Sequence, residues 1–124
     1  MLVSTPISAV MTREVWTLRP HDTMQLAQEI FRARGIHHLP VVDQEKRVVG
    51  MISKSDYLML LHGFTLFNTK DSLEFNEKTL STMLVEEVMA APVAVIKPGD
   101  TLETAAAMFR ENRFHALPVV ENPG

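Results

Sequence analysis

The sequence predicts an α/β protein (α+β in some classifications) with two pseudo-symmetric units, each with the element order β-α-β-β-α. One observation is the stretch Ile36–Asp56, which reads as a β-hairpin that runs directly into a helix. The other is that residues 1–46 are repeated in residues 79–124. Self-similarity at a fixed offset indicates one supersecondary unit used twice.

The hairpin is predicted from two apolar runs, Leu39–Val42 and Val48–Ile52, joined by a polar turn. The second run ends in Ser53-Lys54-Ser55-Asp56, and a helical pattern starts at Tyr57. Ser and Asp at such a junction can cap the free N–H groups of the first helical turn. A helix N-terminus also suits a phosphate, and a carboxylate can accept hydrogen bonds from a ribose diol. Both uses of this junction remain open.

The repeat has an offset of 78 residues and needs no gap. Fifteen positions are identical in the two copies, and their first-copy members are Leu2, Val10, Met11, Val15, Pro20, Asp22, Thr23, Ala27, Phe31, Arg32, His37, Leu39, Pro40, Val41 and Val42.

In the first copy, Val15–Leu18 alternates in polarity and predicts a short strand. A helix follows, with Asp22 as N-cap and Gln25 completing a capping box, and it ends near Arg34 with Gly35 at the C′ position. The residues that this helix is expected to bury are Leu26, Ala27, Ile30 and Phe31.

The second copy predicts the same elements. Asp100 is expected to cap its helix and Glu103 to complete the box, with Ala105, Met108 and Phe109 facing inward. Between the copies, Leu80–Met89 has helical spacing and predicts another helix. At the N-terminus, a helical turn is expected to place Ile7, Val10 and Met11 on one side.

Composition excludes several functional classes. The chain of 124 residues has no Cys, which excludes disulfides, thiolate nucleophiles and Cys-based zinc sites. Its net charge of −3, with scattered Lys and Arg, predicts no nucleic-acid partner. No apolar run approaches the roughly 20 residues of a membrane span, and no signal peptide is visible. We therefore expect a cytoplasmic protein that does not insert into membranes.

Two sets of residues have the types that catalytic or metal sites use. His37 and His38 are adjacent on a strand, so their side chains point to opposite faces, and a structural use is favoured over a metal site. Ser53, His115 and Asp56 could suggest a hydrolytic triad, but no G-x-S-x-G pattern surrounds the serine. The sequence therefore predicts no catalytic residues and no metal site.

The motifs resemble a known family when they are taken in order. Val10-Met11, Pro20 with Asp22-Thr23, His38–Asp43 and Gly50–Asp56 together resemble a cystathionine-β-synthase (CBS) domain. Two such domains in tandem resemble a Bateman module. The resemblance implies a first CBS repeat at residues 1–62 with its N-terminal segment, a connecting segment at 63–87, and a second repeat at 88–124.

The second repeat matches the motif only through Glu121. The sequence then stops at Gly124, inside the expected hairpin turn, which would leave an open sheet edge. We therefore expect these residues to be part of a longer chain. The resemblance also implies that the two units pack through their sheets.

In the family, adenine nucleotides bind in clefts between the two copies. The resemblance implies that cleft one uses Ser53 and Ser55 toward phosphate and Asp56 toward the ribose hydroxyls. Its walls would be Pro92, Ala94, Phe114 and His115.

Cleft two would take its walls from Glu14, Trp16, Ile36 and His37. Its carboxylate would fall at position 134, which the sequence does not contain. Trp16 has two open interpretations, stacking on a base or filling a sheet–helix interface.

The resemblance implies a non-catalytic regulatory module that binds an adenosine-containing ligand (AMP, ADP, ATP or S-adenosylmethionine) and needs no cofactor. The family also implies a homodimer formed through the CBS helices. Two alternatives stay open: a constitutive homodimerisation scaffold without ligand, and a regulatory fragment of a larger enzyme, transporter or channel.

Overall fold

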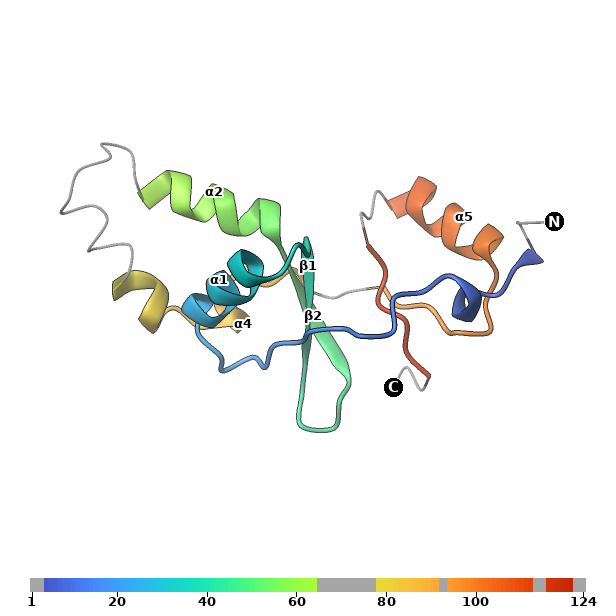
Figure 1. The fold of residues 1–124 in the computed structure, drawn as a ribbon, viewed down its shortest axis with the longest axis horizontal. Coiled ribbons are helices and arrows are strands. Elements are labelled where there is room, and N and C mark those ends of the chain that lie inside the picture. The colour runs from blue at the N-terminus through green and yellow to red at the C-terminus, as the bar shows by residue number, and fades with distance from the viewer. Residues whose placement is uncertain (1–3, 65–77, 92–93, 113–115, 122–124) are drawn as a thin grey trace. The chain divides into compact units, whose positions relative to one another are not determined.

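The computed structural model describes residues 4–64, 78–91, 94–112 and 116–121 (Figure 1). The chain divides into two compact units. We call Trp16–Pro92 the contiguous unit and Met1–Val15 with Val93–Gly124 the split unit. This division assigns the N-terminal segment to the unit that holds the second copy, whereas the repeat boundaries inferred above remain a prediction.

Helices and strands are both present, as predicted. The contiguous unit contains α1 (Met24–Ala33), β1 (His38–Val42), β2 (Val48–Ser53), α2 (Lys54–Phe64) and α4 (Val85–Val88). The split unit contains the 3₁₀ turn η2 (Ile7–Ala9) and α5 (Leu102–Asn112).

The predicted β-hairpin is confirmed. β1 and β2 are antiparallel, with His38 opposite Ser53 and Leu39 opposite Ile52. The register shifts by one residue at Val41/Val42, so the ladder contains a bulge just before the turn.

The hairpin turn is organised by Asp43. Its carboxylate accepts hydrogen bonds from the backbone N–H groups of Glu45 and Arg47, each at 2.9 Å, and from Arg47 Nε at 2.9 Å. The backbone hydrogen bond from Arg47 is the main cause that holds the pKa of Asp43 below its usual value. Lys46 has a φ of 64°, the left-handed conformation that closes this turn.

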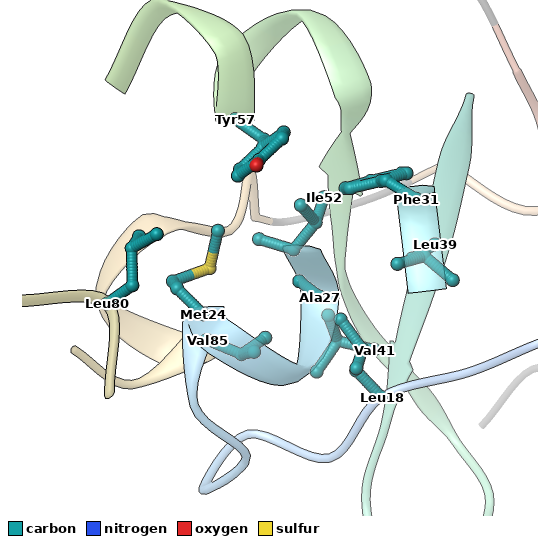
Figure 2. Packing of buried hydrophobic residues seen from close by; sticks show 10 residues of the cluster. All are labelled: Leu18, Met24, Ala27, Phe31, Leu39, Val41, Ile52, Tyr57, Leu80 and Val85. Atoms are coloured by element: carbon teal, nitrogen blue, oxygen red, sulfur yellow. The ribbon is translucent and has the colours of Figure 1, made fainter. Parts of the chain in front are cut away.

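The core of the contiguous unit lies where α1, the hairpin and α2 meet (Figure 2). Apolar residues at helical spacing on α1 pack against residues that alternate along the strands. The Phe31 ring stacks on Tyr57, with ring centres 5.6 Å apart. The buried residues of this core are Leu18, Met24, Ala27, Phe31, Leu39, Val41, Ile52, Tyr57, Leu80 and Val85.

The predicted N-caps are wrong by one residue in both copies. Thr23 Oγ1 accepts from Leu26 N at 3.4 Å, and Thr101 Oγ1 accepts from Thr104 N at 3.3 Å. The carboxylates of Asp22 and Asp100 instead turn back and accept from the N–H groups of Arg19 (2.7 Å) and Lys97 (2.9 Å). Each acid therefore closes the turn before the helix, and the following threonine caps it.

Three other predictions need correction. Val15–Leu18 forms no strand ladder, because only Leu18 bridges Val41. Gly35 is not left-handed, since none of the described glycines has a positive φ. The helix predicted over Leu80–Met89 is interrupted: residues 78–82 are helical, Leu84 is extended and bridges Thr23, and α4 begins at Val85.

The interruption exists because residues 83–86 lie against the start of α1. Their backbone groups bond to the turn before the helix, which an unbroken helix would prevent. The bonds are Val85 N to Asp22 O (2.8 Å), Glu86 N to Pro20 O (3.0 Å) and Met24 N to Met83 O (2.8 Å).

The split unit repeats these three bonds at the 78-residue offset. The N-terminal segment lies against the start of α5 as residues 83–86 lie against α1. The bonds are Ile7 N to Asp100 O (2.7 Å), Ser8 N to Pro98 O (2.9 Å) and Leu102 N to Thr5 O (3.0 Å).

The core of the split unit is smaller. Its buried members are Ile7, Ile96 and Ala105, with Met11 and Met108 among the residues packed against it. The inward placement of Phe109 is wrong, because this side chain is 37% exposed. Val10 is 59% exposed, so it does not share the buried side of Ile7 as expected. Phe109 corresponds to the buried Phe31, and among the described residues of the split unit no element corresponds to β2 or α2.

Candidate functional site

The junction between β2 and α2 carries three of the predicted site residues. Ser53 ends β2, and its Oγ accepts a hydrogen bond from Asp56 N at 3.0 Å. Lys54 N donates to the carbonyl of His37 at 2.7 Å. The capping use of Ser53 is therefore present, and the junction is tied to the residue before β1.

The polar side chains at this junction can still form hydrogen bonds with a ligand. A serine hydroxyl that accepts one bond still has a proton to donate, so capping by Ser53 does not prevent a contact with a ligand oxygen. Ser55 and Asp56 are exposed in the first turn of α2. The helix start supplies partial positive charge from its N–H groups, and the Asp56 carboxylate is an acceptor for hydroxyl donors.

The outer edge of β2 is bordered by the segment after α4. Met51 N donates to Ala90 O at 3.1 Å, and Ala90 N donates to Met51 O at 2.9 Å. A Cβ placed on Gly50 would meet the side chain of Met89, with the sulfur inside any permitted contact distance. The sequence identified Gly50 only as part of a motif. The structure shows why a glycine is needed there: Met89 approaches the backbone too closely for a side chain.

The predicted walls of cleft one cannot be assembled into a site. Pro92, Phe114 and His115 lie outside the described residues. Ala94 is half-buried and belongs to the split unit, whereas Ser53 and Asp56 belong to the contiguous unit. Their role as a ligand site therefore stays a prediction.

Three of the predicted walls of cleft two belong to the contiguous unit. Trp16 is 45% exposed, so it does not fill a sheet–helix interface. The guanidinium carbon of Arg34 lies 4.5 Å from the centre of its ring, a cation–π contact. Ile36 packs against the core and His37 is exposed. Glu14, the fourth, is exposed in the split unit.

A groove of about 470 Å³ lies beside the hairpin turn. Its residues carry both signs of charge, and Arg47 is already paired with Asp43 and Glu45. None of the predicted site residues lines it, so it gives no support to the nucleotide site. The lining residues are Arg19, Pro20, His21, Asp43, Gln44, Glu45 and Arg47.

Within the described ranges of the chain, no group of three or more His, Cys, Asp or Glu side chains is placed to hold a metal ion. No helix there is long and apolar enough to cross a membrane.

Comparison with known proteins identifies relatives of the whole chain. The family model described as the CBS domain matches residues 7–63 and 85–124, more than half of the chain. An uncharacterized protein of Methanocaldococcus jannaschii is 31% identical over 115 residues, which cover 93% of this chain and 40% of the relative. This chain thus spans less than half the length of that relative.

Solved structures show the same fold. The CBS domain of a CBS-domain-containing membrane protein from Sphaerobacter thermophilus matches with a TM-score of 0.80 and 26% identity, covering 98% of this chain and 80% of that one. CBSX2 of Arabidopsis thaliana, solved in complex with AMP, matches with a TM-score of 0.72 and 26% identity. That match covers 96% of this chain and 84% of the other.

Proposed function

Because the chain belongs to the CBS-domain family, which matches it in two segments, we propose that it is a non-catalytic regulatory module that binds an adenosine-containing ligand. The observation that carries this proposal is the β2–α2 junction, where a hydroxyl, a carboxylate and a helix start lie together. The likeness to an AMP-bound relative favours AMP as the first ligand to test.

In this proposal, the ligand phosphate lies at the start of α2. Ser53 and Ser55 donate hydroxyl hydrogen bonds to it, and the helix N-terminus adds a favourable field. Asp56 accepts hydrogen bonds from the ribose hydroxyls, which an ionised carboxylate does at two oxygens. Ser53 Oγ accepts a hydrogen bond from the Asp56 N–H. A phosphate that binds the Ser53 hydroxyl is therefore held close to the backbone that positions Asp56.

Other residues complete the proposed sites. The walls of cleft one are Pro92, Ala94, Phe114 and His115, and those of cleft two are Glu14, Trp16, Ile36 and His37. The 45% exposure of Trp16 supports a stacking role, because part of the residue's surface is accessible and the ring already contacts the flat guanidinium of Arg34.

The proposed regulatory output is a population shift between arrangements of the module. A ligand that touches both repeats favours the arrangement in which both sets of contacts form. The free energy available for the shift equals the difference in ligand binding free energy between the two arrangements, so tight binding alone is not enough.

The main alternative is a homodimerisation scaffold that binds no ligand. α2 supports it, because Leu58 is 50% exposed and Met59 is 72% exposed on this helix. Adjacent exposed apolar side chains on a helix favour a protein partner, and Met adapts well to such a surface.

A thermal-shift titration with AMP, ADP, ATP and S-adenosylmethionine tests the proposal. A ligand at one hundred times its Kd stabilises the folded state by about 2.7 kcal/mol. We expect one of these ligands to raise the Tm of the wild type and to have little effect on Asp56→Ala. Glu87→Ala, which removes an exposed carboxylate on α4, is the matched control and keeps the shift.

The scaffold alternative gives the opposite pattern. No ligand changes the Tm, the wild type is a dimer in solution, and Asp56→Ala leaves that dimer intact. A substitution of both Leu58 and Met59 by Ser then converts the dimer to a monomer.

A further inference from the structure

The groove beside the hairpin turn lies between two turns of the contiguous unit. One wall is the turn of residues 19–21, which precedes α1, and the other is the turn of residues 43–47, which joins β1 to β2 (Figure 1). Directly before these turns, Leu18 N donates to Pro40 O at 2.9 Å, and Val42 N donates to Leu18 O at 2.8 Å. These two bonds hold the walls next to each other.

Each wall is also held in shape by its own hydrogen bonds. In the first wall, the Asp22 carboxylate accepts from Arg19 N at 2.7 Å, and Pro20 O accepts from Glu86 N at 3.0 Å. In the second wall, the Asp43 carboxylate accepts the three bonds that organise the hairpin turn. Walls that are ordered in advance lose little conformational freedom when a ligand binds. The groove volume of about 470 Å³ lies within the roughly 300–1,000 Å³ of small-molecule sites.

The charges of the residues that line the groove balance. Apart from His21, the charged groups are two guanidinium groups, of Arg19 and Arg47, and two carboxylates, of Asp43 and Glu45. A simple anion would be repelled by the carboxylates, and a simple cation would be repelled by the guanidinium groups. A small molecule that carries both an ammonium group and a carboxylate can pair with both signs. The charge pattern therefore favours a zwitterion over a simple ion.

Hydrogen-bonding groups of both kinds remain available in the groove. Among the described residues, no ion pair includes the Arg19 guanidinium, whose fork of N–H groups fits a carboxylate at two oxygens. Glu45 Oε2 is paired with Arg47 Nη2 at 2.6 Å, whereas Glu45 Oε1 has no partner in the described part of the chain. The first wall thus offers donors to a carboxylate, and the second offers an acceptor to an ammonium group.

We propose that this groove binds a small zwitterion of the amino-acid type, either a free amino acid or a dipeptide. Its carboxylate pairs with Arg19 in the turn before α1, and its ammonium group pairs with Glu45 in the hairpin turn. The groove is separate from the β2–α2 junction, because none of the residues of that junction lines it. Binding in the groove is therefore independent of the proposed nucleotide site.

The experiment titrates the nitrogen-15-labelled full chain with each of the twenty standard amino acids and with L-alanyl-L-alanine, followed by NMR. We expect saturable binding that shifts the backbone amide signals of the two turns. The separation of the two charges differs between the single amino acids and the dipeptide, so the tighter binder identifies which of the two fits the groove. The N-acetyl and carboxamide derivatives of the tightest binder each lack one charge, and we expect both to bind at least tenfold more weakly.

Two variants test the two contacts separately. Arg19→Gln and Glu45→Gln each remove one charge from an exposed side chain of similar length, and each is expected to weaken binding at least tenfold. Lys97→Gln is the matched control, because Lys97 is the exposed counterpart of Arg19 in the second copy. This variant should bind as tightly as the wild type.

Several outcomes would overturn the proposal. One is that no amino acid or dipeptide binds saturably, and another is that the shifted amides lie outside residues 19–21 and 43–47. If the N-acetyl derivative binds as tightly as its parent, the groove takes a simple anion, and if the carboxamide does, it takes a simple cation. Unchanged binding by Arg19→Gln or by Glu45→Gln would contradict the contact assigned to that residue.

Discussion

The contiguous unit and the split unit have the same local backbone but different cores. Three hydrogen bonds between the 83–86 segment and the start of α1 recur between the N-terminal segment and the start of α5, and their lengths agree within 0.2 Å. Phe31, however, is 3% exposed and Phe109 is 37% exposed. Local sequence therefore determines turns, caps and helix starts, whereas burial depends on which elements cover the helix.

Truncating the two phenylalanines should give the largest difference between the units. Phe31→Ala removes a buried ring stacked on Tyr57, and a loss of about 3 kcal/mol in unfolding free energy is expected. Phe109→Ala should cost less than about 1 kcal/mol, because its ring is partly in solvent already. Urea denaturation of both variants measures this, and equal losses would contradict the difference in burial.

Adding a methyl group at Gly50 should have the next largest effect. Gly50→Ala forces Met89 away from β2, and a loss of about 2 kcal/mol is expected, as for other overpacked sites. Gly99→Ala in the split unit is the matched control, since a Cβ there meets nothing within 4 Å. Thermal unfolding should separate the two variants, and a Gly50→Ala protein as stable as wild type would show that the Met89 contact is easily relieved.

The helix caps should behave alike in the two units. Thr23→Ala and Thr101→Ala each remove an N-cap acceptor, at an expected cost of about 1 kcal/mol. Native-state hydrogen exchange at the first amides of α1 and α5 measures each cap separately. Thr→Ser at the same positions preserves the side-chain oxygen and should retain protection. Loss of protection in only one unit would contradict the equivalence of the two caps.

The smallest effect concerns Asp43, whose carboxylate organises the hairpin turn. The pKa of Asp43 is lower in the folded protein than the usual 3.8, so its ionised form stabilises the fold at neutral pH. That contribution is lost as the pH falls from 3.8 through the lower folded value. Asp43→Asn should therefore lower the Tm at pH 7, and the difference from wild type should shrink on acidification. A constant difference across this range would exclude the charge as the cause.

Much of this fold could be predicted from sequence. The hairpin at 38–53, the helices after Pro20 and Pro98 and the helix after Ser53 all follow local patterns of apolar spacing and turn residues. The caps were missed by one residue because Asp22 and Thr23 both offer an oxygen. In the structure, the Asp22 carboxylate accepts from the Arg19 N–H, and the Thr23 hydroxyl caps the helix.

What sequence reasoning missed depends on non-local packing. The break at Met83–Leu84 arises because the start of α1 takes their backbone groups, and no local residue signals this. The inward placement of Phe109 failed because the pattern on a helix shows which face is apolar but not whether another element covers it. For the candidate site, Ser53 and Asp56 could be predicted to lie together, whereas the walls drawn from the other repeat remain a prediction.

The pairing of the N-terminal segment with the start of α5 has a consequence for biosynthesis. All of the contiguous unit lies within residues 16–92, so it can fold once these residues have left the ribosome. Ile7 cannot reach its partner until Asp100 has been made. Residues 5–8 are therefore made before residues 98–102 but placed only after them, and the long loop that they close makes the split unit the slower of the two to fold.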